Sequence, residues 1–207
     1  MSGQPTDVVH RAPSNDKTHG HRVGQGGYVQ TLTTTEIYTN AWMTVREDTF
    51  RRPDGTVGVY GVIDKPPYAL VIAVHERQLH LVEQYRYPLA TRSWEFPQGT
   101  APDRGHMEPR ELAGRELREE TGLRAAQLTH LGTVAIAPGM SSQRGDVYLA
   151  TELTTGAHQR EHEEQDMRSA WWDRMEFEHA VRTGQIIDAQ SIAAYTLLLL
   201  HEKGTHR

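Results

Sequence analysis

The fold of this chain is decided by one stretch of its sequence, Arg115-Glu116-Leu117-Arg118-Glu119-Glu120-Thr121-Gly122-Leu123. Glu116, Glu119 and Glu120 are spaced i, i+3 and i+4, so on an α-helix they project within an arc of roughly 100°. Like charges placed so closely repel, and a divalent cation between them would remove that repulsion. Carboxylate oxygens are the hard ligands that Mg²⁺ and Mn²⁺ prefer. The stretch therefore predicts a helical cation site; the plainer alternative is a solvated amphipathic helix.

Neighbouring residues support a helix with a defined end. Arg115 lies one turn before Glu119 and is placed to form an i, i+4 ion pair with it. Gly122 predicts the C-terminal end of the helix, because glycine adopts the left-handed conformation that stops a helix at little cost. In the plainer alternative of a solvated amphipathic helix, Leu112 and Leu117 would face the core.

The residues before this helix give it a context. Trp94-Glu95-Phe96-Pro97-Gln98-Gly99 predicts a short apolar strand that ends in a loop of Pro and Gly. Strand, loop and helix together resemble the Nudix hydrolase family, whose box runs Gly, five residues, Glu, seven residues, then Arg-Glu-apolar-x-Glu-Glu-x-Gly-apolar. Residues 115–123 match its second half position by position. The resemblance implies that Glu116, Glu119 and Glu120 bind Mg²⁺, for which Mn²⁺ can substitute, with the backbone carbonyl of Gln98 as a further ligand.

The first half of the box departs from the family pattern. Counted back from Arg115, the leading glutamate falls on Met107, and Glu108 lies one place later. Gly99 is two residues earlier than the spacing demands, so the loop 100–106 carries a two-residue insertion. In the family this glutamate mainly supports the helix arginine, so the departure affects the geometry of the loop more than metal binding. Glu108 could take the place through a local shift.

Length and composition agree with an enzyme of one domain with ragged ends. A chain of 207 residues is long enough to bury a sizeable core. It has no cysteine, which excludes disulfides, a thiolate nucleophile and a Cys-ligated zinc. No stretch is typical of a signal peptide or a membrane span, so we expect a cytoplasmic protein without a membrane partner. The formal net charge of -5 argues against a nucleic-acid partner bound through a basic surface.

Apolar patterning divides the chain into three parts. Residues 1–27 predict a flexible tail without chemistry, 28–66 an N-terminal set of β-strands, and 67–203 the Nudix domain. We expect strands at 29–32, 43–50, 57–63, 69–74, 79–85, 128–136, 146–153 and 167–172, and helices at 176–183 and 189–202. The order of elements predicts an α/β fold. With the resemblance, it implies a Nudix-type α/β/α sandwich around a mixed sheet, preceded by an N-terminal antiparallel hairpin or sheet.

Segments outside the box are similar to the branch of ADP-ribose pyrophosphatases and nucleoside diphosphate sugar hydrolases. They are Glu83-Gln84-Tyr85-Arg86, Ala137-Pro138-Gly139-Met140-Ser141-Ser142-Gln143-Arg144 and Gly184-Gln185-Ile186-Ile187-Asp188-Ala189-Gln190-Ser191. The branch implies substrate-binding roles for Arg86, Glu95 and Gly139. Arg86 would bind phosphate with its planar fork, and a surface ion pair is the alternative. The branch also implies a homodimer in which the N-terminal strands are exchanged.

The resemblance implies a general base in an acidic loop after the last long strands. That loop is Arg160-Glu161-His162-Glu163-Glu164-Gln165-Asp166. Alignment of the strand expected at 167–172 implies that Glu163 is the base, with Glu164 as the next candidate and Glu119 as a third residue of the catalytic set. A carboxylate beside water that a metal has acidified can accept its proton. The alternative is a solvated acidic loop.

Three functions stay open. The branch implies a Mg²⁺-dependent hydrolase that cleaves the pyrophosphate linkage of ADP-ribose or a related nucleoside diphosphate sugar, giving a nucleoside monophosphate and a sugar phosphate. An RNA 5′ pyrophosphohydrolase is the second, because Phe96-Pro97-Gln98-Gly99 also resembles the loop of that branch. The third is a catalytically weak Nudix-like sensor that binds a nucleotide sugar, motivated by Met107 and the enlarged loop.

Overall fold

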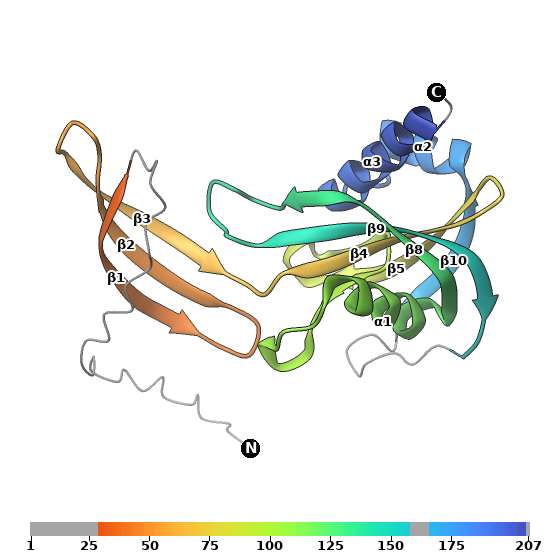
Figure 1. Cartoon of the computed structure of the whole chain (residues 1–207), viewed down its shortest axis with the longest axis horizontal. Coiled ribbons are helices and arrows are strands. Elements are labelled where there is room, and N and C mark those ends of the chain that lie inside the picture. Colours follow the sequence, from red (N-terminus) through yellow and green to blue (C-terminus); the bar gives the residue numbers. More distant parts are fainter. Residues whose placement is uncertain (1–28, 158–165, 206–207) are drawn as a thin grey trace, which may run out of the picture.

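The computed structural model describes residues 29–157 and 166–205. The expected tail at 1–27 and the candidate bases Glu163 and Glu164 lie outside these residues. The N-terminal strands form a three-stranded antiparallel sheet in the order β1-β2-β3, made of β1 (Gln30–Thr39), β2 (Thr44–Arg51) and β3 (Val57–Asp64). This sheet stands beside the main body of the molecule and leads into it at the end of β3 (Figure 1). The expected N-terminal sheet is therefore confirmed.

The main body is built on a seven-stranded mixed sheet. Its central order is β10-β5-β4-β9-β8, and two short strands, β6 and β7, pair with β5 and β4. Strands β4 and β9 run parallel, and the other named pairs of this sheet run antiparallel. The bounds are β4 (Tyr68–His75), β5 (Gln78–Arg86), β6 (Thr91–Glu95), β7 (Gln98–Thr100), β8 (Leu123–Ala135), β9 (Arg144–Thr155) and β10 (Arg168–Asp173). Short 3-10 turns η1 (Tyr87–Leu89) and η2 (Pro102–Arg104) follow β5 and β7.

Helices cover both faces of this sheet. Successive side chains of a strand point to opposite faces, and the buried strand β4 uses both. Ala69, Val71 and Ala73 pack in one cluster with Leu112 and Leu117 of α1 (Pro109–Thr121). The intervening β4 residues pack with α2 (Arg174–Arg182) and α3 (Ala189–Thr205) in the other cluster. Figure 1 shows α1 on one side of the sheet and α2 with α3 on the other. The α/β/α sandwich is confirmed.

Strands β1 and β8 extend well beyond their predicted ranges, whereas the bounds of the other predicted strands differ by one or two residues. Strand β1 was expected at 29–32 but continues to Thr39. Its continuation is rich in threonine, a β-branched residue that favours strands, but it has no apolar face by which a strand could be recognised in the sequence. All of its residues are exposed, so no burial pattern marked it in the sequence. Strand β8 begins at Leu123, directly after the glycine that ends α1, and not near residue 128. Gly122 has a φ of 75° and its N–H donates to the carbonyl of Arg118 at 2.9 Å, as expected of a helix end. No helix within residues 29–157 and 166–205 combines the length and apolarity needed to cross a membrane.

Candidate active site

The three carboxylates of α1 lie at the inner side of the helix. Glu116 and Glu120 are buried, and the Glu119 side chain is 13% exposed. Arg115 Nε donates to both carboxylate oxygens of Glu119 at 2.8 Å, which is the expected i, i+4 pair. The helix therefore brings its acidic residues toward the sheet and does not spread them over a solvated face.

Strand β7 meets α1 at Gly99. This residue pairs with Ala69 of β4, and a Cβ atom placed on it would lie 2.4 Å from Glu116 Oε2 and 2.7 Å from Glu116 Cδ. Only glycine leaves room for the carboxylate at this place. Gln98, the residue before it, is buried, and its side-chain Oε1 has no hydrogen-bond partner among the described residues. The backbone of strand β7 at Gly99 and the carboxylate of Glu116 thus lie in direct contact in a confined space.

The donor set fits a hard divalent cation by its chemistry, because it consists of carboxylate and carbonyl oxygens. Glu116, Glu119 and Glu120 would hold such an ion, with the Gln98 carbonyl beside them. Among the described residues, however, no three His, Asp or Glu side chains converge closely enough to form a ready-made metal site. Glu119 is directed to Arg115 and Glu116 lies against Gly99.

Arg86 and Glu95 form an ion pair across the β5–β6 hairpin. Arg86 Nη2 lies 2.6 Å from Glu95 Oε1, and Arg86 Nε donates to Glu95 Oε2 at 3.1 Å. Gln84 Nε2 also donates to Glu95 Oε1, at 2.5 Å. The Glu95 side chain is 1% exposed and that of Arg86 is 38% exposed. Burial raises the pKa of Glu95 to about 7, and the charge of Arg86 opposes this rise. A buried carboxylate thus orients a guanidinium that still reaches solvent.

This ion pair lies on the face of the sheet that α1 covers. Ala73, which packs with α1, pairs with His80 of β5. Because alternate residues of a strand share a face, Gln84 and Arg86 lie on the same face as His80. Glu95 pairs with Val82 in that same register. The fold therefore places the predicted phosphate-binding arginine and the predicted metal helix on one side of the sheet.

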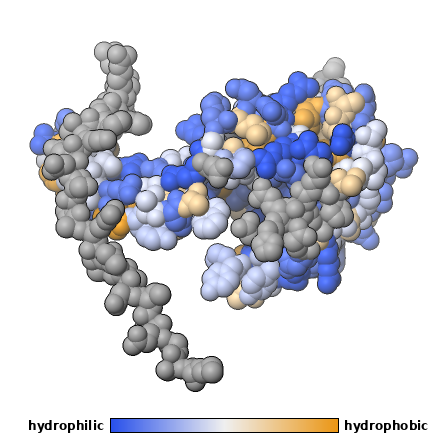
Figure 2. Space-filling model, turned by 90° about the horizontal axis from the view of Figure 1, so that it is seen from below, coloured by the Kyte–Doolittle hydropathy of each residue, from blue (hydrophilic) through white to orange (hydrophobic). Residues whose placement is uncertain are grey.

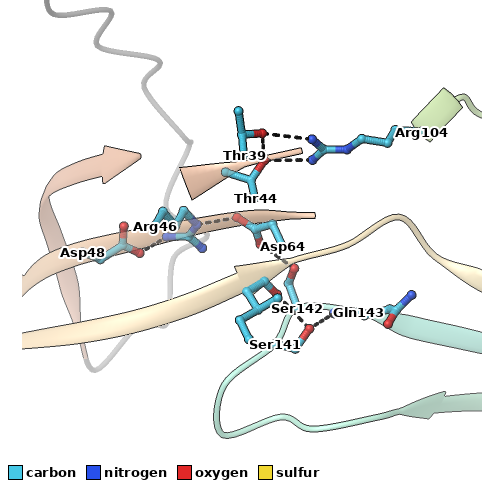
Figure 3. A network of polar contacts seen from close by, with 10 residues as sticks. Thr39, Thr44, Arg46, Asp48, Asp64, Arg104, Ser141, Ser142 and Gln143 are labelled. Atoms are coloured by element: carbon cyan, nitrogen blue, oxygen red, sulfur yellow. Dashed lines mark hydrogen bonds and ion pairs between the residues drawn. The ribbon is translucent and has the colours of Figure 1, made fainter. Parts of the chain in front are cut away.

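Gly139 lies in a loop that is tied to the N-terminal sheet. Tyr60 OH donates to the carbonyl of Gly139 at 2.6 Å, and Ser142 Oγ donates to Asp64 Oδ1 at 2.6 Å. Figure 3 shows Asp64 at the end of β3, between Ser142 and Arg46 of β2. Arg46 Nε donates to the other carboxylate oxygen of Asp64 at 2.5 Å. The end of β3 therefore joins the N-terminal sheet to the segment before β9.

Comparison with known families matches two consecutive parts of the chain. The nucleoside diphosphate sugar hydrolase N-terminal domain matches residues 29–63, and the NUDIX domain matches residues 64–195. The chain belongs to the Nudix family. The family expected from the carboxylate helix is thereby confirmed.

Named relatives agree with this membership. An ADP-ribose pyrophosphatase from Mycobacterium tuberculosis is 33% identical over 79% of this chain and 80% of its own length. A methanol dehydrogenase activator from Bacillus methanolicus is 29% identical over 86% of this chain and 96% of its own length. A crystal structure of an ADP compounds hydrolase superposes with a TM-score of 0.76, covering 86% of this chain and 96% of that one. At 20% identity this last likeness concerns the fold alone.

The departure in the first half of the Nudix box has a structural consequence. Met107 packs against the apolar cluster beneath α1, so the position of the leading glutamate is filled by a packing residue. Glu108 is exposed just before α1, and its backbone carbonyl accepts from Leu112 N at 3.0 Å. One observed partner of Arg115 is Glu119. In this Nudix chain a glutamate of the same helix thus helps to hold the helix arginine.

Two residues near the site were not singled out in the sequence, Asp64 and Arg104. Arg104, in the loop that carries the insertion, has a left-handed backbone with φ 55°. Its guanidinium donates to Thr44 Oγ1 at 3.0 Å and to Thr39 Oγ1 at 3.5 Å (Figure 3). It also donates to the carbonyl of Asn40 at 3.5 Å. Both residues act through partners that are distant in the sequence, so local patterns do not reveal them. For Arg104, the unusual length of its loop was the one signal in the sequence.

Proposed function

We propose that this Nudix protein is a metal-dependent pyrophosphohydrolase that cleaves a nucleoside diphosphate sugar, with ADP-ribose as the favoured substrate. The products are a nucleoside monophosphate and a sugar phosphate. The observation that carries the proposal is the contact of the Glu116 carboxylate of α1 with Gly99 of β7, on the face that also holds Arg86 and Glu95. The relative named ADP-ribose pyrophosphatase supports the choice of substrate.

The reaction adds water to one phosphorus and breaks the bond between that phosphorus and the bridging oxygen. When bound, Mg²⁺ neutralises phosphate charge and makes water a stronger nucleophile. Glu116, Glu119 and Glu120 hold the ion in this scheme, and Mn²⁺ can replace it. Arg86 binds two phosphate oxygens with its fork, and Glu95 keeps the guanidinium in place. Glu163 accepts the proton of the attacking water, with Glu164 as the second candidate.

A homodimer belongs to the proposal. The N-terminal sheet exposes apolar side chains that a monomer would normally cover: Ile37 is 61% exposed, Trp42 65%, and Val59 60%. In the space-filling view this sheet is a lobe separate from the main body, with apolar and polar side chains interspersed on it (Figure 2). We propose that a second copy covers this lobe and that residues 28–66 act as the dimer and substrate segment before the Nudix domain at 67–203. Light scattering on the full chain tests the dimer.

A panel of substrates tests the proposed reaction. It contains ADP-ribose, other nucleoside diphosphate sugars, a dinucleotide and 5′-triphosphorylated RNA, each with Mg²⁺, with Mn²⁺ and with a chelator. The proposal expects release of a monophosphate from a nucleoside diphosphate sugar, dependent on metal. Cleavage of the RNA alone would favour the RNA pyrophosphohydrolase, and saturable binding without cleavage would favour the sensor. Fractionation of cells that carry the tagged chain tests the proposed cytoplasmic location.

A further inference from the structure

A cavity lies between the insertion loop, the β3–β4 connection and the start of α1. Its volume is about 480 Å³, within the range of about 300–1,000 Å³ that small-molecule pockets occupy. Its lining includes the cationic residues Lys65 and Arg104, the acidic residues Asp64 and Asp146, and the mainly apolar residues Tyr68, Ala101, Met107 and Leu112. We call it the loop cavity. Its wall includes Arg104, Gly105 and His106, which belong to the loop that is longer than the Nudix box requires.

Two residues that line the loop cavity lie close along the chain to the carboxylate site. Leu112 lies four residues before Glu116 on α1, which on an α-helix is a rise of about 6 Å. Ala101 follows Gly99 by two residues on the other wall. Because Gly99 and Glu116 are in contact, these two walls of the cavity both lead along the chain to the residues proposed to hold the metal, on α1 over about one helical turn.

The charges around the loop cavity favour a ligand rich in oxygen. Its acidic residues already have donors: Asp64 accepts from Arg46 and Ser142, and Asp146 accepts from Thr133 Oγ1 at 2.6 Å. Among the described residues Arg104 forms its hydrogen bonds with neutral oxygens, and its charge also acts on Asp64, whose pKa it lowers. Lys65 makes no hydrogen bond or ion pair with any part of the chain that the structure describes. Two cationic side chains are thus available to hydroxyl or phosphate oxygens.

The wall that carries Arg104 is held in place. Its left-handed φ of 55° is unfavourable for a residue with a side chain, and such conformations persist where the surroundings enforce them, often beside ligands. Here the guanidinium is anchored to the β1–β2 turn through Thr39 and Thr44 (Figure 3) and through the carbonyl of Asn40. The N-terminal sheet thereby fixes one wall of the cavity.

We propose that the loop cavity binds the sugar half of the nucleoside diphosphate sugar. Arg104 and Lys65 donate to its hydroxyl or phosphate oxygens, and Met107 and Leu112 pack against the ring. This inference rests on the proposed function, because it assumes that the diphosphate lies at the α1 carboxylates. It assigns the inserted residues a role in choosing the sugar.

Equilibrium binding of ADP-ribose and of ADP, measured by calorimetry in the presence of a chelator, tests the assignment without hydrolysis. The wild-type chain should bind ADP-ribose more tightly than ADP. Arg104→Ala should lower the affinity for ADP-ribose about tenfold, the usual effect of losing a hydrogen bond to a charged group, and leave ADP unchanged. Lys65→Ala should act in the same direction. Arg110→Ala is the matched control, because Arg110 is exposed on the first turn of α1 outside the cavity.

Three results would overturn the assignment: no binding of ADP-ribose by the wild-type chain, no preference of that chain for ADP-ribose, or equal losses for both ligands in Arg104→Ala. Cleavage is measured separately. If the chain binds ADP-ribose through Arg104 but never cleaves it, the sugar site is supported and the proposed function is refuted. If the Arg104→Ala and Lys65→Ala variants cleave ADP-ribose as fast as the wild-type chain and with the same KM, the function is supported and the sugar site is refuted.

Discussion

The carboxylate of Glu116 lies directly against the backbone of Gly99, at a distance where a Cβ on residue 99 would overlap Oε2. This contact joins the buried face of α1 to strand β7 and to the Gln98 backbone beside it. It relates the two halves of the Nudix box in space, although the loop between them is longer than the family pattern. A carboxylate confined in this way has few orientations, which favours a defined metal position.

Gly99→Ala should reduce kcat/KM by about 100-fold, because a displacement of Glu116 by about 1 Å is enough to disturb a catalytic arrangement. The new Cβ would lie 2.4 Å from Glu116 Oε2, so the carboxylate must move. The matched control is Gly114→Ala on α1, whose Cβ would lie 3.6 Å from Leu128 Cδ1 in ordinary contact. That control should retain activity and gain roughly 0.5–1 kcal/mol of stability. Equal activity of both variants would refute the role of the contact.

Glu119→Gln should lower turnover by about 100-fold or more, since it removes a charged ligand from the proposed metal site. Folding should change little, because the lost pair with Arg115 is an i, i+4 helix pair worth roughly 0.2–0.5 kcal/mol. Steady-state kinetics measure the loss of turnover, and thermal unfolding measures the change in stability. Glu111→Gln, at an exposed position in the first turn of α1, is the control. An unchanged rate in Glu119→Gln would remove Glu119 from the metal site.

Glu163→Gln should lower the rate by about 100-fold while metal affinity stays close to that of the wild-type chain, because a general base contributes roughly 10²–10⁴-fold without binding the ion. Rates as a function of Mg²⁺ concentration separate the two effects. Glu164→Gln is the comparison variant. A much larger loss in Glu164→Gln than in Glu163→Gln would transfer the role of base to Glu164.

Local patterns predicted much of the fold, and contacts between distant residues account for what they missed. The i, i+3, i+4 acids and Gly122 predicted α1 and its end because a helix depends on near neighbours. Strand β1 lacks an apolar face, so its length was not visible. Asp64 was missed because its partners Arg46 and Ser142 lie 18 and 78 positions away.

The same reason limits what the sequence could say of the site. Arg86 and Glu95 were each expected to bind substrate, but their mutual ion pair depends on the register of β5 with β6. The loop cavity depends on three segments that meet only in the folded chain. The sequence showed that the loop 100–106 is two residues longer than the family pattern, but it did not show that this loop forms a wall of the cavity.

Tyr68→Phe should raise the free energy of unfolding by about 1 kcal/mol, because a buried hydroxyl without a partner is costly. Tyr68 is 4% exposed, and its OH has no hydrogen bond among the described residues. Chemical denaturation measures the change. Gly145→Ala provides the contrast, since its Cβ would lie 1.9 Å from the Tyr68 ring and should destabilise the chain by roughly 1–3 kcal/mol. A loss of stability in Tyr68→Phe would reveal a partner for the hydroxyl.

His80 should make the protein less stable as pH falls from about 6.5 to about 4. Burial lowers the pKa of His80 from 6.5 to about 4, so within this window the unfolded chain takes up a proton that the folded chain does not. The ring packs edge-on against Trp171, at 4.6 Å between centroids. His80→Phe should therefore lower the slope of stability against pH in this window below that of the wild-type chain, as measured by urea denaturation across pH.

Glu95 acts with the opposite sign and serves as the control for this titration. Its pKa is raised from 4.5 to about 7, so the folded chain binds the extra proton and stability falls as pH rises through that range. Glu95→Gln should remove this fall and leave the His80 contribution in place. Identical pH profiles for the wild-type chain and His80→Phe would show that His80 titrates normally.

The formation of AMP from ADP-ribose, followed by chromatography while Mg²⁺ is titrated into the metal-free full chain, tests the central claim most directly. We expect no AMP with the chelator, a saturable rise in rate with Mg²⁺, and formation of ribose 5-phosphate in an amount equal to that of AMP. AMP formation that persists undiminished with the chelator, or no AMP at any concentration of Mg²⁺ or Mn²⁺, would contradict it.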